Sequence, residues 1–465
     1  MKKVSKIKLT SIKKVKTPLL IDPLNGNLFK TIISFAIPIM LTGVLQLAFN
    51  AADMIIVGQA EGADPVGQVG ATSSLINLIV NLFIGFSVGV SVCVSREYGA
   101  KNSENVEKYV HTAIATAIIG GIFCTLVGVI GARYFLTLMN TPITHIDGAT
   151  LYMRIYFLSM PASMIYNFGA AILRSLGNSR TPLLILASSG LVNVMFNFIF
   201  VNFLGLAVEG VAIATVISQY VSLIWILIYL SKADGPHRLI LKKISFTPKC
   251  LKSIVAIGLP AGISGSLFSL SNVVVQSSIN SFGGVVVNGN TASSNIEGFI
   301  YTASNSFHQT AITFVGQNRG AGKLDRILKC VWVCLIYSMI FEVVLATLSI
   351  VLRETLLGIY IKNSEKAISI GIMRLMYVGI PHFLCGMMDV INGAVRGMGY
   401  SFSPMLISLT CACFFRIVWI WTVFKAFPTL EMIYIVYPIS WLLCAVCLSL
   451  LFAFIYRSTK KKLQL

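Results

Sequence analysis

Charged residues are scarce in this chain of 465 residues. Only 11% of its residues are Asp, Glu, Lys or Arg, whereas a soluble globular protein carries about 25%. Apolar residues make up 56%, and the mean hydropathy is +0.82. This composition excludes a water-soluble protein. The net charge of +19 does not indicate nucleic-acid binding, because the basic residues lie in short stretches between apolar runs.

The chain also lacks the short motifs of several enzyme classes. It has no HExxH, no GxSxG and no His/Cys cluster, so an intramembrane enzyme would have no catalytic set. The segment GQNRGAGK is not a phosphate-binding loop, because five residues separate Gly316 from Gly322 and Leu324 stands where such a loop has Ser or Thr. Cys444 and Cys447 lie in an apolar run without a second pair, so we expect neither a metal site nor a cofactor.

What the chain does have is twelve apolar runs that can cross a bilayer, since a spanning helix needs roughly 20 predominantly apolar residues. We therefore predict an all-α polytopic membrane protein. The predicted spans lie near residues 31–57, 67–94, 109–131, 151–172, 183–203, 210–230, 254–281, 291–315, 331–351, 371–395, 403–424 and 432–456.

Lys and Arg are unevenly distributed about these spans. Of the 36 in the chain, eight lie in the tail 1–30, sixteen in alternate loops and four in the tail 457–465, all on one side of the membrane. That side is predicted to be cytoplasmic. The first thirty residues show no cleavable signal peptide, so we expect a multi-pass protein of the cell (plasma) membrane with both basic tails in the cytoplasm.

An internal repeat divides the spans into two sets of six. Several pairs share a spacing of 222 residues: Pro38 and Pro260, Arg174 and Arg396, Gly177 and Gly399, Pro182 and Pro404. Because six spans separate the copies, the repeat is parallel, related by an axis along the membrane normal. We predict an N-lobe over 31–230, a cytoplasmic linker over 231–253 and a C-lobe over 254–456, with a central cavity between the lobes.

The segments that carry a family resemblance lie at matching places in both halves. They are NAADMIIVG at 50–58, GATSSLINLIVNLFIGFSVG at 70–89, REYGAKN at 96–102, LRSLGNSRTP at 173–182, NTASSNIEGF at 290–299, GQNRGAGK at 316–323 and VRGMGYSFSP at 395–404. From about residue 25 to 456 the chain resembles the multidrug and toxic compound extrusion (MATE) exporters. The resemblance implies two six-helix lobes in a V shape, and export of cationic or amphipathic organic compounds in exchange for inward H⁺ or Na⁺.

Asp53 is the main candidate for ion coupling. An acid in the hydrocarbon region is costly, so it usually faces a cavity or a partner. Burial favours the neutral acid, whereas an arriving Na⁺ or organic cation favours the carboxylate. The residue also matches the first-helix acid of the MATE family. The alternative is an acid at a helix end that reaches external water.

Asn193 and Asn197 lie four residues apart, on one face of the predicted fifth span. We expect them to meet Asp53, where amide oxygens and a carboxylate would suit Na⁺. Many related exporters have Asp at the position of Asn197, so this chain lacks one proton carrier of that pattern. The alternative is that the two amides only form hydrogen bonds between helices.

The second lobe has no acid at the position of Asp53, which maps onto Val275. Its best ionisable candidate is Asp389, with structural pairing to Arg374 or Arg416 as the alternative. For Glu342, which matches no family motif, a pairing or a lipid-headgroup contact stands as the alternative to a role in transport. Further candidates for the substrate cleft are Asn272, Gln276, His308, Gln309 and Glu297, the last of which would cap a helix N-terminus or line the outer mouth.

These observations predict a secondary active multidrug exporter that works by alternating access. Its expected partners are small organic cations, the coupling ion and the lipid bilayer, but not nucleic acid, and we expect a functional monomer. The alternative is a flippase for a lipid-linked precursor. That activity would need a cleft lined with Arg and Lys, whereas Arg154, Arg374 and Arg416 are the cations that the predicted spans contain.

Overall fold

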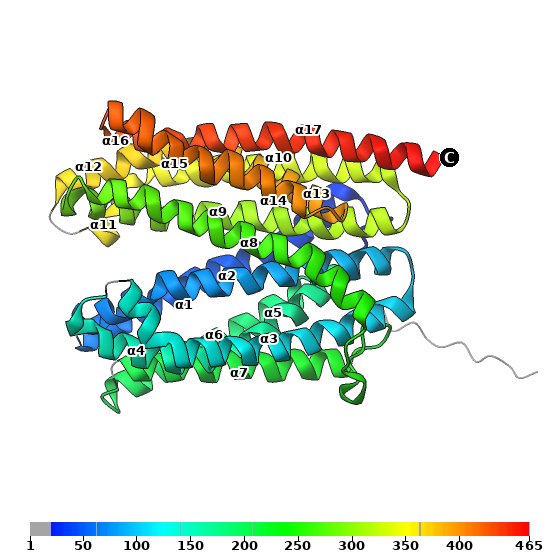
Figure 1. Ribbon diagram of the computed structural model, residues 1–465, viewed down its shortest axis with the longest axis horizontal. Helices are drawn as coiled ribbons and strands as arrows, with labels where there is room; N and C mark the ends of the chain where they lie inside the picture. Colours follow the sequence, from blue (N-terminus) through cyan, green and yellow to red (C-terminus); the bar gives the residue numbers. More distant parts are fainter. Residues whose placement is uncertain (1–19, 62, 140, 207, 362–363, 465) are drawn as a thin grey trace, which may run out of the picture.

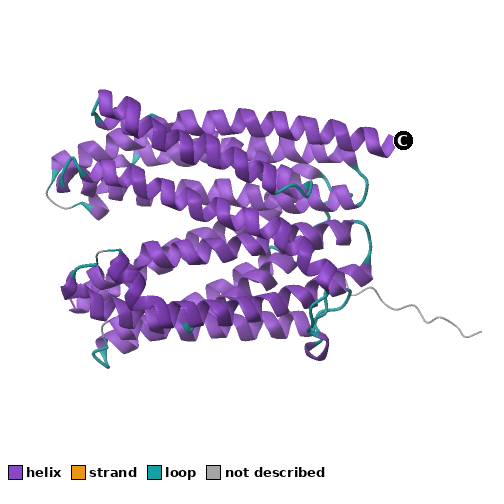
Figure 2. Ribbon diagram, in the orientation of Figure 1, coloured by secondary structure: helices purple, strands orange, loops and turns teal. Residues whose placement is uncertain are grey.

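The computed structural model describes residues 20–61, 63–139, 141–206, 208–361 and 364–464, and every regular element in them is helical (Figure 2). The predicted basic tail before residue 20 lies outside this part of the chain. The first half contains α1 (Leu28–Glu61), α2 (Ala63–Gly99), α3 (Ser103–Leu138), α4 (Ile143–Phe157), α5 (Met160–Ser175), α6 (Arg180–Asn202) and α7 (Val208–Ser231).

The second half is more segmented. Its α-helices are α8 (Pro248–Asn280), α9 (Gly284–Gly320), α10 (Leu324–Val351), α11 (Arg353–Tyr360), α12 (Glu365–Arg374), α13 (Phe383–Gly397), α14 (Phe402–Ser408), α15 (Phe415–Trp419), α16 (Leu430–Tyr434) and α17 (Val436–Gln464). Short 3₁₀ or π segments are η1 (Leu241–Lys243), η2 (Leu375–Gly379), η3 (Ile380–His382), η4 (Leu409–Phe414) and η5 (Ile420–Phe424). The predicted spans 371–395 and 403–424 are therefore each built from several helical pieces.

Ten continuous helical stretches in the described chain are long and apolar enough to cross a membrane, and the bent pair α4 and α5 makes eleven. The prediction of twelve spans thus counts one helix that does not satisfy this criterion. It is α9, predicted over 291–315, which is 37 residues long and rich in Ser, Thr and Asn. Helix α9 packs against α1, α2, α10 and α13, so its polar side chains face other helices.

The fourth predicted span, 151–172, is a broken helix. Helices α4 and α5 meet at an angle of 47°. Pro161 lies in the first turn of α5 and has no N–H to donate to the carbonyl of Phe157, so the helical hydrogen bonding is interrupted at this point. The Thr125 hydroxyl of α3 donates to that carbonyl at 2.8 Å instead, which satisfies the acceptor and fixes the bend.

The helices form two bundles. Figure 1 draws the first bundle, α1–α7, in the lower half of the picture and the second bundle, α8–α17, in the upper half. The bundles meet along α2 and α8, and they diverge toward the end where α1 joins α2. Glycines allow the close approach: a Cβ on Gly85 would clash with the backbone of Gly262, and one on Gly89 with the backbones of Ile254 and Gly258. The Gly85-x-x-x-Gly89 pair therefore serves helix packing.

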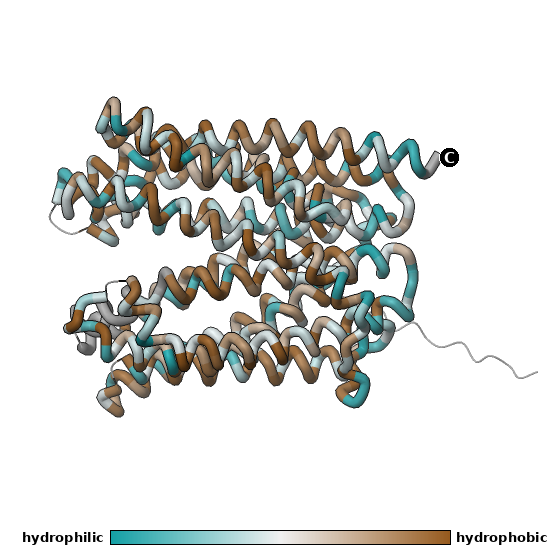
Figure 3. Tube along the Cα trace, viewed as in Figure 1, coloured by the Kyte–Doolittle hydropathy of each residue, from teal (hydrophilic) through white to brown (hydrophobic). Residues whose placement is uncertain are grey.

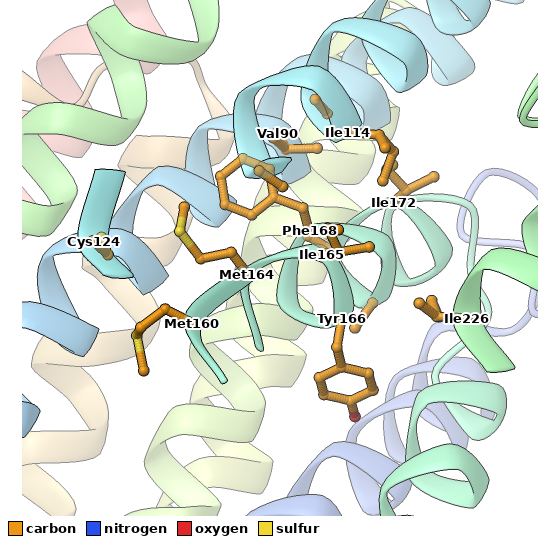
Figure 4. Packing of buried hydrophobic residues seen from close by; sticks show 14 of the residues in the cluster. Val90, Ile114, Cys124, Met160, Met164, Ile165, Tyr166, Phe168, Ile172 and Ile226 are labelled. Atoms are coloured by element: carbon orange, nitrogen blue, oxygen red, sulfur yellow. The ribbon is translucent and has the colours of Figure 1, made fainter. Parts of the chain in front are cut away.

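Each bundle has an apolar interior and an apolar exterior. In the first bundle α5 lies at the centre, where Ile165 and Phe168 pack among Val90 of α2, Ile114 of α3 and Ile226 of α7 (Figure 4). Apolar residues also cover the outer faces of most helices (Figure 3), as expected where lipid replaces water. Large exposed side chains of this kind include Ile130, Phe198, Leu450 and Phe454.

Residues 20–27 form a strap across both bundles at the end where α9 joins α10. The Ile21 N–H donates to the carbonyl of Gly177 in the first bundle at 3.1 Å. In the second bundle, Lys323 donates to the carbonyl of Leu24 at 3.0 Å, and Arg326 donates to the carbonyl of Pro23 at 3.0 Å and to that of Gly26. The strap thus fastens the two bundles together at one end.

The predicted linker lies against the first bundle at this same end. The Ile240 N–H donates to Nε2 of His111 on α3 at 3.1 Å, and Lys243 bridges Glu107 of α3 at 2.9 Å. The Thr247 N–H donates to the Thr112 hydroxyl at 3.2 Å, just before α8 begins. The connection between the bundles is therefore anchored to α3.

Candidate functional site

Asp53 and Asn197 meet in the first bundle, where α1 crosses α6. Phe49, one turn before Asp53, occupies the space that a side chain on Gly190 would need, so the two helices approach closely. The amide of Asn197 donates to the carboxylate of Asp53 and, at 3.4 Å, to Oδ1 of Asn193. The expected meeting of these three residues is thus present in the structure.

Thr215 of α7 extends this polar group, because it accepts from the Asn193 amide at 3.5 Å. Asn197 is fully buried and its Oδ1 has no hydrogen-bond partner. A buried oxygen without a donor costs free energy unless a ligand or proton serves it. The carboxylate, the two amide oxygens and the Thr215 hydroxyl are hard oxygen donors, so they fit a small cation such as Na⁺.

The neighbours of Asp53 on α4 are aromatic. Tyr152 and Tyr156 lie close enough to Asp53 for its negative charge to act on their hydroxyl groups. Their rings stack on each other with centroids 6.0 Å apart. Neither an Arg nor a Lys forms an ion pair with Asp53 among the residues that the structure describes. The carboxylate is therefore half-buried without a permanent counter-charge.

A cavity of about 600 Å³ lies mainly in the second bundle, bounded by α2, α8, α9, α12, η2, η3, α13, α14, η4, α15 and α17. All six of the cleft candidates from the sequence line it: Asn272, Gln276, Glu297, His308, Gln309 and Asp389. Asp53 is not among its lining residues. The two groups of candidates therefore occupy separate places, one in each bundle.

Glu297 does not cap a helix N-terminus, because α9 begins thirteen residues earlier, at Gly284. It is buried and forms a bidentate ion pair with Arg374, at 2.9 and 2.8 Å. The third donor group of Arg374 reaches Oδ1 of Asn290 at 2.7 Å, and its guanidinium lies over the ring of Tyr437. Both side chains face the cavity, but their charges neutralise each other.

Asp389 is not paired with Arg374 or Arg416, so that alternative is wrong. Arg374 binds Glu297, and Arg416 donates to Asn272 and to Ser440, both at 3.0 Å. Glu342 does not contact lipid headgroups either, since it is fully buried in the bundle. Its carboxylate accepts from the Ser338 hydroxyl at 2.7 Å and lies 2.8 Å from Nδ1 of His382, so the expected pairing is the correct interpretation.

Sequence reasoning missed Arg396, which it placed in a loop on the cytoplasmic side. The structure places it in the last turn of α13, buried and lining the cavity. Two aromatic residues of α17, Tyr437 and Trp441, line the cavity as well. One feature of the sequence pointed to Arg396: it matches Arg174 at the spacing of the repeat, so both arginines belong to the repeated motif.

The two bundles differ in the charges they carry at equivalent positions. Val275, the counterpart of Asp53, is buried and apolar. The second bundle instead has acids at other positions, namely Glu297, which is paired with Arg374, and Asp389. The two bundles therefore place their intramembrane acids differently.

Comparisons with known proteins match this architecture. Residues 38–199 and 260–422 each match the MatE family model, at the same offset of 222 residues that the sequence repeat shows. The probable multidrug resistance protein YpnP of Bacillus subtilis (strain 168) is 25% identical over 390 residues, covering 83% of this chain and 86% of the relative. The probable multidrug resistance protein NorM of Thermotoga maritima is 23% identical over 385 residues, covering 82% of each.

The fold also resembles solved structures. An outward-facing conformation of a multidrug resistance MATE family transporter superposes with a TM-score of 0.88, covering 95% of this chain and 98% of that chain at 20% identity. At this identity the likeness bears on the fold alone. Since the family model matches both halves of the chain, the protein belongs to the MATE family of multidrug efflux transporters and is not an enzyme.

Proposed function

We propose that this transporter exports amphipathic organic compounds, organic cations among them, in exchange for inward H⁺ or Na⁺. The observation that carries the proposal is the Asp53 site: a half-buried carboxylate that accepts from Asn197 and has no basic partner among the residues that the structure describes. Such a carboxylate is stabilised when a proton or Na⁺ neutralises it. Ion entry and ion release then change the charge of the first bundle in each cycle.

The coupling step follows from the position of this site between helices. Asp53 lies on α1, Asn193 and Asn197 on α6, and Thr215 on α7. A bound cation would draw oxygens from all three helices inward, whereas its loss would leave an uncompensated carboxylate. The free energy of ion binding thereby favours one arrangement of the helices over the other.

We further propose that lobes 31–230 and 254–456 move against each other in alternating access, and that one chain is sufficient. Both lobes come from a single chain and meet along α2 and α8. The end with the strap, where Lys and Arg are abundant, would face the cytoplasm of a cell whose plasma membrane holds the protein.

The test is transport by the full chain in sealed vesicles without ATP. We expect ethidium to move against its gradient when a proton or sodium gradient is supplied, and comparison of sodium-free and sodium-containing buffer at fixed pH identifies the ion. Asp53→Asn should reduce coupled transport at least tenfold while the protein remains inserted and folded. Asp147→Asn is the matched control, because Asp147 is an exposed acid that bridges Arg133. Wild-type transport by the Asp53 variant would remove this residue from the mechanism.

Flipping of a lipid-linked precursor is a second candidate, and one observation favours it. Three arginines line the cavity of the second bundle: Arg374, Arg396 and Arg416. The predicted spans of this lobe contained two of them, Arg374 and Arg416. Such a lining suits phosphate groups. Translocation of a fluorescent lipid pyrophosphate by the reconstituted protein, without ethidium transport, would establish this activity in place of multidrug export.

A further inference from the structure

The three arginines of the cavity differ in how far the protein satisfies them. Arg374 forms three hydrogen bonds to Glu297 and Asn290. Arg416 donates from Nε and Nη1, but its Nη2 is buried without a partner. The side chain of Arg396 forms no hydrogen bond to any described residue, and its Nε is buried.

Arg396 is also separated from the nearest acid on its own helix. Asp389 lies seven residues earlier on α13, on the same face but about 10 Å away along the helix axis. The two side chains form no ion pair in the described structure, and their opposite charges attract each other across the cavity. The carbonyl of Asp389 accepts from Nδ1 of His308 at 2.7 Å, so the backbone of this acid is held while its carboxylate faces the cavity.

The arginines of the cavity therefore differ in what they can still bind. Glu297 neutralises Arg374, and Arg416 is held by Asn272 and Ser440, whereas the Nε of Arg396 is buried without a partner among the described residues. A buried guanidinium with open donors that faces a cavity suits an anionic group, because carboxylate and phosphate oxygens accept strong charge-assisted hydrogen bonds from Arg. Two aromatic side chains that line the same cavity, Phe268 and Tyr437, supply ring faces for the rest of such a ligand.

We propose that Arg396 forms a binding subsite for the carboxylate or phosphate group of an amphipathic cargo. This proposal rests on the proposed export function and deepens it by naming a substrate class: compounds that carry an anionic group as well as an apolar or aromatic body. Asp389, about two helical turns away, would then face the cationic group of a zwitterion.

The repeat provides a control for this proposal. Arg174 occupies the same motif position in the first bundle, in the last turn of α5, and its Nε is likewise unpartnered. It is not among the residues that line the cavity. If an arginine at this position only stabilises the helix end, the two residues should behave alike, whereas the subsite requires Arg396 alone.

The test is binding of two fluorescent dyes to the full chain in detergent, measured by fluorescence polarisation. Rhodamine 110 has a free carboxylate, and rhodamine 123 is its methyl ester, so the pair differs only in the anionic group. We expect the wild type to bind rhodamine 110 roughly tenfold more tightly, as one strong charge-assisted hydrogen bond implies. Arg396→Gln should abolish this preference, Arg396→Lys should retain part of it, and Arg174→Gln should retain all of it.

A second cavity variant separates the subsite from a purely structural effect. Asp389→Asn removes the negative charge that would face the cationic ring system common to both dyes, so it should weaken the binding of both and leave the preference for rhodamine 110 unchanged. Equal affinity of the wild type for both dyes, or an unchanged preference in a folded Arg396→Gln protein, would overturn the proposal. Displacement of rhodamine 110 by phosphatidylglycerol through Arg396 would also overturn it, by assigning the site to a lipid headgroup. Ethidium transport by the same variants reports on the export function separately.

Discussion

Glu297 and Arg374 show how a buried charge is tolerated inside a helical membrane protein. Each satisfies the other through two hydrogen bonds, with Asn290 completing the set. Removing one partner of such a pair leaves an uncompensated charge, which costs about 3–5 kcal/mol. We expect Glu297→Gln to lower the melting temperature in detergent by several degrees. The double variant Glu297→Gln with Arg374→Met should recover stability, and a double variant no more stable than the single one would contradict this account.

Asn197 is the second residue on which the ion site depends. It holds the carboxylate of Asp53 through its amide and presents an unpartnered oxygen beside it. Asn197→Ala should therefore reduce ion-coupled ethidium transport about tenfold, since it removes one oxygen ligand and one hydrogen bond to a charged group. Asn202→Ala is the control, because Asn202 lies on the same helix, is exposed and donates only to the carbonyl of Phe198. Equal loss in both variants would contradict a specific role for Asn197.

The candidate site could be predicted in part because polar residues are conspicuous in apolar runs. Asp53 and Asn197 stood out for this reason, as did the six cleft candidates. Arg396 did not, because a residue at the edge of a predicted span cannot be assigned to the bundle interior without knowing where the helix ends. Thr215 is too small and too common in apolar helices to stand out, and its role depends on the rotation of α7 toward α6.

Among the elements, α2 and α8 depend most on the absence of side chains. A Cβ on Gly262 would clash with the backbone of Leu82, whereas one on Gly265 would make an ordinary contact with Asn81 at 3.9 Å. We expect Gly262→Ala to lower both thermal stability and ethidium transport, since overpacking costs about 1–3 kcal/mol. Gly265→Ala should leave both unchanged. The measurement is the melting temperature in detergent together with transport in vesicles, and a neutral Gly262→Ala variant would show that the crossing can spread.

The helices themselves were predictable from hydropathy, but their interruptions were not. Span 4 is broken because Pro161 and Thr125 act together across two helices, and the partner hydroxyl cannot be identified from one segment. The π segments η2, η4 and η5 likewise add residues to a turn without changing the apolar pattern. Composition therefore predicts that a segment is helical, whereas bends depend on neighbours distant in the sequence.

At the scale of the whole molecule, the strap connects the N-terminal residues to both bundles. Arg326 contributes two of its bonds, to the carbonyls of Pro23 and Gly26. We expect Arg326→Ala to weaken the contact between the bundles at this end, which also includes the bond from Gln317 to the carbonyl of Ser175 at 2.7 Å. Hydrogen exchange should then rise in the peptides that contain Ile21 and Gln317.

Lys329→Ala provides the control for this prediction. Lys329 is an exposed basic residue on the same helix, α10, and its side chain forms no hydrogen bond to the described residues. Its substitution removes the same charge without releasing the strap. Exchange that rises equally in both variants would show that charge alone, and not the bonds to residues 20–27, holds this end of the molecule together.

The polarity of α9 has a consequence for how the protein is made. This helix does not reach the apolarity of the other long helices, yet it lies among α1, α2, α10 and α13 in the finished fold. The free energy gained when such a polar segment moves by itself from the insertion machinery into lipid is small. Three residues separate it from α8 and three from α10, so we expect it to enter the bilayer together with one of them as a helical hairpin. On this account the second bundle is assembled from pairs of helices and not from single ones.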